Sequence, residues 1–328
     1  MIRLHVRFTL SLLALCLSLS NSGLAQEGPA EIPAQTFKQE RADFSLQFQD
    51  EVSPYRVTGM FVLPGATEEI EVVFGPLGQR YELAASAGQV EAIDDDRWRW
   101  TAPVGAGVYP LTITDPASGQ SSIINAIVMV PASEAADGRI GDYRIGKYPD
   151  TSRKKNYRNP EGFIQVTQEN QHTLVSPHFT LRQFLCKQAG GWPKYLVLKT
   201  RLLLKLETLL QQANEHWENV HTFTVMSGYR TPYYNRAIGN VSLSRHMFGD
   251  AADIYIDRDG NGRMDDLNGD GKSNYKDATL LATLLEDMTD QPWYQPFLGG
   301  LGKYGTRSHR GPFIHVDVRG YRARWNSP

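Results

Sequence analysis

Residues 226–253 read MSGYRTPYYNRAIGNVSLSRHMFGDAAD. The stretch contains His246 and Asp253, and an apolar run at residues 254–256 follows directly. Nearer the C-terminus, FIHVDV at residues 313–318 supplies another imidazole, His315. Two imidazoles and one carboxylate are a ligand set typical of catalytic zinc, which keeps its fourth position for water. The two stretches together therefore offer the protein ligands of a zinc site.

Alternation of side-chain type predicts that both stretches are β-strands. Successive strand residues point to opposite faces, so each strand would bury an aliphatic row and present polar groups on its other face. The expected aliphatic rows are Ala252, Ile254 and Ile256 in the first strand and Ile314, Val316 and Val318 in the second. The expected polar-face rows are Asp253, Tyr255 and Asp257, and His315, Asp317 and Arg319.

The pattern S-x-H-x-x-G-x-A-x-D at residues 244–253 lies between SGYR at 227–230 and FIHVD at 313–317. Together these motifs resemble the zinc D-Ala-D-Ala carboxypeptidase and murein endopeptidase family, which shares its fold with VanX-type dipeptidases and the hedgehog signalling domain. The resemblance covers roughly residues 176–324. It implies that zinc is bound by His246, Asp253 and His315, and that Arg230 and Ser244 bind substrate. A structural salt bridge is the alternative role for Arg230.

The residue that transfers the proton is less clear from the motifs. Many relatives carry an acidic residue three positions before the last histidine ligand, where this chain has Pro312. Asp317 is one replacement, because it shares a strand face with His315; its alternative role is to hydrogen-bond a ligand histidine. His309, in the preceding loop, is a further candidate for proton transfer or oxyanion stabilisation, or else an ordinary loop residue.

Length and composition indicate a soluble protein of two domains, expected to be an exported monomer. Residues 1–25 have the pattern of a secretory signal peptide, with Arg3 and Arg7 before an apolar run too short to span a membrane. Export would place the chain in the periplasm or outside the cell.

Without the two signal arginines, 32 of the 34 basic residues remain against 36 acidic ones, and this mild acidity argues against a nucleic-acid partner. Cys186 is then the sole cysteine, expected to be buried.

Changes in composition divide the rest of the chain. Residues 26–37 are a predicted linker, and short alternating runs at 38–131 predict an all-β, immunoglobulin-like sandwich. Its role as a spacer or as a contact to the cell wall or a partner stays open. Residues 132–175 are a predicted polar connector. Residues 176–328 are a predicted α+β domain with a small antiparallel sheet, and helix is expected from about His178 through a leucine stripe at 196–210.

An acidic, glycine-rich insertion at residues 257–277 resembles a dockerin calcium loop. Calcium loops place oxygen ligands at positions 1, 3, 5, 9 and 12, with glycine at position 6. One register gives Asp257, Asp259, Asn261, Asp265 and Asn268; the other gives Asp266, Asn268, Asp270, Asn274 and Asp277. Neither has the bidentate glutamate of a tight site, so weak, structural calcium is predicted. A solvated loop without metal is the alternative.

The resemblance implies a zinc-dependent peptidase that cleaves D-amino-acid bonds in peptidoglycan stem peptides. Whether it acts as carboxypeptidase or endopeptidase depends on loops at the ends of the cleft and stays open. The alternative is a binding module of the same fold that carries zinc and calcium without catalysis. The absent acidic residue favours the binding module, whereas Arg230 and the intact ligand set favour the enzyme.

Overall fold

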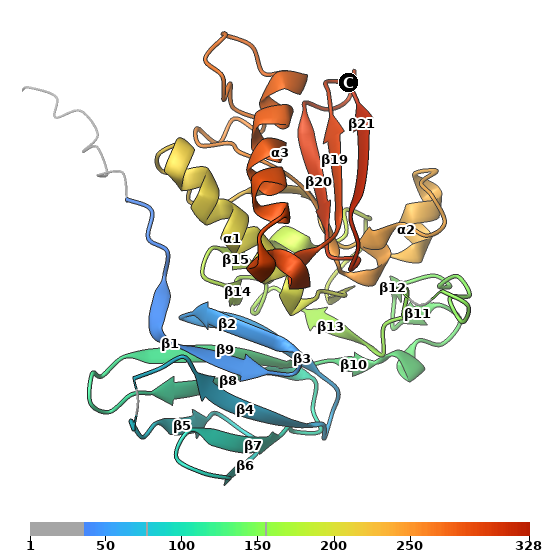
Figure 1. Cartoon of the computed structure of the whole chain (residues 1–328). Helices are drawn as coiled ribbons and strands as arrows, with labels where there is room; N and C mark the ends of the chain where they lie inside the picture. The colour runs from blue at the N-terminus through green and yellow to red at the C-terminus, as the bar shows by residue number, and fades with distance from the viewer. Residues whose placement is uncertain (1–35, 77, 155) are drawn as a thin grey trace, which may run out of the picture. The chain divides into compact units, whose positions relative to one another are not determined.

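The computed structural model describes residues 36–76, 78–154 and 156–328 (Figure 1). The predicted signal peptide and residues 26–35 of the predicted linker lie outside the described residues. In the part of the chain that is described, no helix has both the length and the apolar character needed to cross a membrane.

The N-terminal strands form two β-sheets around a common core. One sheet has the order β2-β1-β4-β7-β6 and the other β3-β9-β8-β5. In β7, Trp98 and Trp100 point into the core while Arg97 and Arg99 point outward, as a half-buried strand requires. The strands are β1 (Arg41–Phe48), β2 (Glu51–Tyr55), β3 (Val57–Val62), β4 (Thr67–Val73), β5 (Glu82–Ala85), β6 (Gln89–Ala92), β7 (Arg97–Thr101), β8 (Gly107–Thr114) and β9 (Ser121–Val128). This arrangement fits a β-sandwich, whereas the immunoglobulin-like topology stays a prediction.

The segment expected to be a polar connector contains regular structure. β13 pairs with β10 on one side and β16 on the other, and its residues Phe163, Ile164 and Val166 are buried in the C-terminal core. Part of the segment at 132–175 therefore packs into the C-terminal core, to which Ile140, Tyr143, Ile145 and Val175 also belong. The short strands are β10 (Val130–Pro131), β11 (Arg139–Ile140), β12 (Tyr143–Arg144), β13 (Gly162–Val166), β14 (Leu174–Ser176), β15 (Phe179–Thr180) and β16 (Lys194–Leu196).

A second five-stranded sheet, β17-β18-β20-β19-β21, carries the residues of interest. The expected small antiparallel sheet is present but mixed, since β19 pairs with β21 in parallel. The expected aliphatic rows, including Ile254 and Val316, belong to the core, and α3 packs against β19 and β20. The strands are β17 (Thr224–Ser227), β18 (Ala251–Tyr255), β19 (Gly300–Tyr304), β20 (Phe313–Asp317) and β21 (Ala323–Ser327). Few helices beside mixed sheets agree with an α+β fold.

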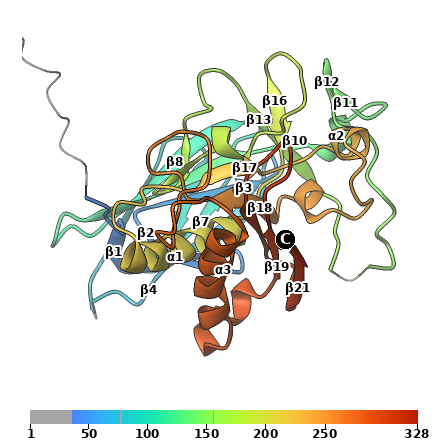
Figure 2. The same cartoon turned by 90° about the horizontal axis from the view of Figure 1, so that it is seen from above.

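The helices flank this sheet (Figures 1 and 2). They are α1 (Thr200–His216), α2 (Pro232–Ala237) and α3 (Tyr275–Thr289), with 3-10 turns η1 (Ala132–Glu134), η2 (Leu181–Phe184), η3 (Arg245–Phe248) and η4 (Pro292–Phe297). The leucine stripe is buried along α1, as predicted. The prediction that helix begins near His178 was wrong. That stretch forms β15 and η2, and Leu196 lies in β16. The apolar residues before Thr200 are buried in the core, but they do not recur at the spacing of a helix.

Contacts along α1 join it to the N-terminal strands. Thr200 Oγ1 donates to the main-chain oxygen of Gly59 at 2.8 Å, and Gln211 Nε2 donates to the Tyr55 hydroxyl at 2.9 Å. Both bonds are buried, and Arg201 adds an ion pair with Glu51 at 2.9 Å. The N-terminal sheets therefore contact α1, the helix whose leucines are buried in the C-terminal core.

Candidate functional site

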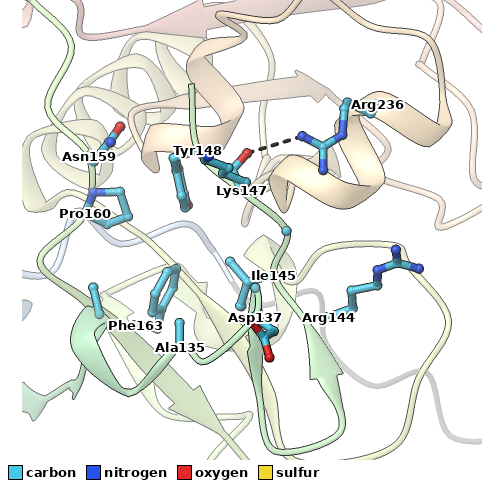
Figure 3. A pocket seen from close by; sticks show the side chains of 13 residues that line it. Ala135, Asp137, Arg144, Ile145, Lys147, Tyr148, Asn159, Pro160, Phe163 and Arg236 are labelled. Atoms are coloured by element: carbon cyan, nitrogen blue, oxygen red, sulfur yellow. Dashed lines mark hydrogen bonds between the residues drawn. The ribbon is translucent and has the colours of Figure 1, made fainter. Parts of the chain in front are cut away.

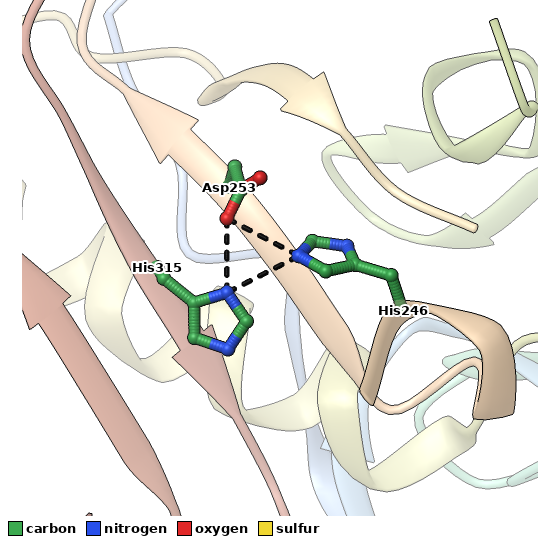
Figure 4. Close-up of side chains that lie close together, drawn as sticks. All are labelled: His246, Asp253 and His315. Carbon is green, nitrogen blue, oxygen red and sulfur yellow. Dashed lines mark hydrogen bonds and ion pairs between the residues drawn. The ribbon is translucent and has the colours of Figure 1, made fainter. Parts of the chain in front are cut away.

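Three side chains from separate parts of the C-terminal half meet at one point (Figure 4). β18 and β20 are antiparallel neighbours in which Asp253 lies opposite His315, and η3 brings His246 to them. The atoms His246 Nε2 and His315 Nδ1 are 3.2 Å apart, and they lie 3.2 and 2.9 Å from Asp253 Oδ1. The predicted trio is therefore brought together, and all three residues are buried.

Hydrogen bonds on the outer side of each ring fix how the imidazoles point. His246 Nδ1 donates to the main-chain oxygen of Gly228 at 2.7 Å, which directs Nε2 to the meeting point. His315 Nε2 lies 3.1 Å from Asp317 Oδ2, which directs Nδ1 there. The three atoms that face one another can all offer lone pairs, so a single cation between them would satisfy all three.

The spacing of these atoms fits a zinc ion. Zinc bonds of about 2.0–2.1 Å in a tetrahedron separate neighbouring ligand atoms by roughly 3.3 Å. The observed separations of 2.9 to 3.2 Å are close to that value. The residues present therefore fit a metal that takes three protein ligands and keeps one position open.

The electrostatics of the cluster favour a positive charge at the same point. Burial alone would raise the pKa of Asp253, but its contacts with His246 and His315 hold that pKa well below the usual carboxyl value. Burial would likewise lower the pKa of His315, but its hydrogen bonds to Asp253 and Asp317 raise it. Burial lowers the pKa of His246, which keeps this imidazole neutral, the form that binds metal.

Arg230 forms a salt bridge within the protein, which is the alternative role stated for it. Its Nη2 donates to Asp253 Oδ2 at 2.5 Å and its Nε donates to Ser227 Oγ at 2.8 Å. The guanidinium thus holds the second oxygen of the ligand carboxylate and turns Oδ1 toward the imidazoles. The structural salt bridge, rather than a clamp for a substrate carboxylate, describes Arg230 in this structure.

The glycines of the two motifs are required by close packing. Gly249 has φ +69°, and a Cβ there would lie 2.5 Å from the main chain of Val197. A Cβ on Gly228 would lie 2.6 Å from Cα of Phe184. Only glycine fits at these two positions. Gly249 follows the turn that carries His246, and Gly228 supplies the main-chain oxygen that binds His246, so each glycine lets its segment pack closely against the core.

Comparison with known families agrees with this geometry. Residues 161–267 match the family model described as Peptidase M15. Within the C-terminal half, residues 161–267 are thus similar to M15 peptidases, and we call residues 161–328 the M15-like domain. The match includes His246 and Asp253 and begins ahead of the expected start at 176, at β13. His315 lies beyond it, so the structure alone unites this residue with the other two. No curated protein matches the chain closely enough to add a relative.

Asp317 lies behind His315 in the M15-like domain and is fully buried. Its Oδ1 accepts from Gly300 N at 2.7 Å and from Arg319 Nε at 2.9 Å, and its Oδ2 faces His315. Burial would raise the pKa of Asp317, but hydrogen bonds from His315 and Arg319 hold it far below the usual range. A carboxylate so fully occupied is a weak proton acceptor, so its surroundings favour the orienting role over the catalytic one.

The trio opens onto a cavity of about 590 Å³. Arg230 and Ser244 lie in its lining, and Asp253 is the sole carboxylate among the described lining residues. His309 is exposed and lies outside this lining. The structure therefore does not bring His309 to the site; His309 lies in the turn that the bridge between Arg307 and Arg310 closes.

Four aromatic residues and two arginines in the cavity wall were not predicted: Tyr157, Tyr304, Phe313, Trp325, Arg245 and Arg310. Tyr304 and Phe313 stack with ring centroids 4.5 Å apart, and Trp325 Nε1 donates to the Tyr304 hydroxyl at 2.7 Å. These residues meet because β19 lies between β20 and β21. The order of strands is determined by long-range pairing, which the alternation of residues within a single strand does not reveal.

A second cavity, of about 570 Å³, lies between the segment at 132–163 and α2 (Figure 3). Tyr148, Phe163 and Ile145 form an apolar wall, and Arg236 donates to the main-chain oxygen of Lys147 at 3.3 Å. The described residues around it include Asp137 but no histidine or cysteine. It therefore lacks the metal-binding chemistry of the first cavity.

The insertion at residues 257–277 brings together only part of the predicted calcium ligands. Asp257, Asp259 and Asp265 of the first register converge. In the second register, Asp277 is buried and caps α3, accepting from Asn274 N at 2.7 Å and Leu267 N at 2.9 Å. Among the described residues, Asp266, Asp270 and Asp277 do not form a comparable group. Calcium binding by either register stays a prediction.

Proposed function

We propose that the M15-like domain is a zinc-dependent peptidase that cleaves D-amino-acid-containing peptide bonds of peptidoglycan outside the cytoplasmic membrane. The observation that carries the proposal is the triangle of His246 Nε2, His315 Nδ1 and Asp253 Oδ1, at zinc-ligand spacing and open to a cavity. When bound there, zinc would polarise the scissile carbonyl and make water more acidic. The match to a peptidase family supports hydrolysis rather than another use of the metal.

The surrounding residues would preorganise this reaction. The Gly228 main-chain oxygen, Arg230 and Asp317 each hold one ligand from behind, so the ligands keep their geometry while substrate enters. The aromatic wall around Tyr304 and Trp325 would exclude bulk water from the reacting bond. These residues act by positioning and shielding, which leaves the attacking water as the nucleophile.

Hydrolysis of muropeptides by the purified protein tests the proposal. We expect the protein to cut stem peptides in the presence of zinc and to lose this activity with a chelator, as measured by the masses of the products. His315→Ala should remove activity, whereas His309→Ala, six residues away and exposed, should retain it. Cleavage that survives both the chelator and His315→Ala would contradict a zinc peptidase at this site.

A second candidate, a binding module that does not cut its ligand, is favoured by one observation. Apart from Asp253, no carboxylate lines the described part of the cavity, so a separate acidic proton acceptor is absent there. In the same experiment a binding module would retain muropeptide and release no product.

A further inference from the structure

Four arginines line the cavity of the proposed peptidase site, and three of them are paired internally. Arg230 is paired with Asp253, Arg245 with Asp250 and Arg319 with Asp317. Arg310 is different: among the described residues, no carboxylate lies within salt-bridge distance of it. The cavity therefore has one arginine whose charge is not used within the described protein.

The Arg310 guanidinium is nevertheless held in place. It lies over the stacked rings of Tyr304 and Phe313, 5.3 and 4.7 Å from their centroids, and Nη1 donates to the main-chain oxygen of Gly305 at 2.7 Å. Within the described residues, neither Nε nor Nη2 has a hydrogen-bond acceptor. These two nitrogens form the edge of a guanidinium that binds a carboxylate through two parallel hydrogen bonds. The aromatic stack thus fixes the side chain and leaves its binding edge unoccupied.

Strand pairing places this group next to the ligand trio. Gly302 lies opposite His315, and Tyr304 lies opposite Phe313, one step further along the same face of β19 and β20. Two residues of a strand span about 7 Å. One residue of an extended peptide spans about 3.5 Å, and a metal–oxygen bond and a hydrogen bond add the rest. A carboxylate on the residue just after the scissile bond would therefore reach Arg310.

We propose that Arg310 selects substrates in which the amino acid released as the amine carries a free carboxylate on the carbon next to that amine. This inference rests on the proposed function. A chain-terminal D-amino acid meets the requirement, and so does a crosslink whose amine-bearing centre keeps its own carboxylate. In the reaction, one water adds across the C–N bond and the released amine gains a proton, while the carboxylate stays unchanged. Arg310 is thus a specificity-determining residue, and Arg230 is not.

A pair of synthetic peptides that differ only at the last group, a carboxylate or a carboxamide, tests this directly. Wild-type protein should prefer the acid, and Arg310→Gln should lower kcat/KM for the acid by roughly 10- to 100-fold, mainly through KM. The carboxamide should be little affected. Arg310→Lys should restore part of the loss, since it keeps the charge without the two parallel bonds. Arg307→Gln, which changes an exposed arginine of the same loop, is the matched control and should behave as wild type.

An equal loss on both peptides, or no loss on either, would overturn the role of Arg310. If wild-type protein cleaves neither peptide, the proposed function fails and the inference is judged by binding of the two peptides, measured by calorimetry. Preference for the acid that disappears in Arg310→Gln would then support Arg310 as the carboxylate site. Equal binding of acid and carboxamide by the wild type would overturn it.

Discussion

Each ligand of the proposed zinc site is held by one residue behind it. The ligands themselves were predictable, because few residue types bind zinc and because the short motifs around them resemble those of a zinc peptidase family. Their partners were not: Arg230 and Asp253 are far apart in the chain, and their ion pair depends on β17 lying beside β18. Two roles were predicted for Asp317: to orient His315 or to transfer the proton. The hydrogen bonds that occupy its carboxylate oxygens favour the orienting role.

Replacing Asp317 with asparagine separates these two roles. If Asp317 orients His315, the substitution should weaken zinc binding by about 10- to 100-fold, because a ligand histidine loses its charged partner. Competition with a chromogenic chelator would measure the dissociation constant. Unchanged zinc affinity together with lost turnover would instead make Asp317 the proton acceptor.

At the level of elements, β18 and β20 were predicted because the alternation of apolar and polar residues indicates which side chains face the core. β13 lacks that alternation, since Phe163 and Ile164 are adjacent and both buried, so its segment was expected to be a polar connector. The start of α1 was also misplaced, since a buried extended segment and a buried helix are equally apolar. The insertion after β18 shows a related limit: loop spacing predicted two calcium registers, but it did not reveal that Asp277 caps α3.

Calcium should raise the melting temperature of the protein if the first register binds it. The reason is mass action, since an ion that binds only the folded loop stabilises the folded state. Calorimetry over a calcium series would measure the shift, with Asp257→Asn expected to remove it. Asp270→Asn, in the second register, is the matched control and should leave the shift in place. A melting temperature that does not respond to calcium would remove the predicted site.

At the scale of the whole molecule, α1 contacts both the N-terminal sheets and the residues behind the zinc site. Lys205, on α1, is buried and donates to the main-chain oxygens of Asp317 at 2.7 Å and Phe297 at 3.1 Å. The sequence indicated a core-facing helix, but a lysine within its buried face could not be foreseen from the leucine stripe. Burial lowers the pKa of Lys205 from the usual 10.5 to about 7.

This shift predicts how stability depends on pH. Between about pH 7 and 10.5 the unfolded chain binds a proton at Lys205 that the folded protein has lost, so the free energy of unfolding should rise with pH. The contribution of this group is at most about 1.4 kcal/mol per pH unit. Urea unfolding at several pH values would measure it, and Lys205→Met should reduce the slope. Equal slopes in the two proteins would show that Lys205 stays charged when folded.

The most direct test of the account is the zinc content and coordination of the purified protein, measured by elemental analysis and X-ray absorption at the zinc edge. The account predicts one tightly bound zinc per chain with two imidazole nitrogens and a carboxylate oxygen, lost in His246→Ala and Asp253→Ala. A folded protein that binds no zinc, or variants that bind it as tightly as wild type, would contradict the central claim.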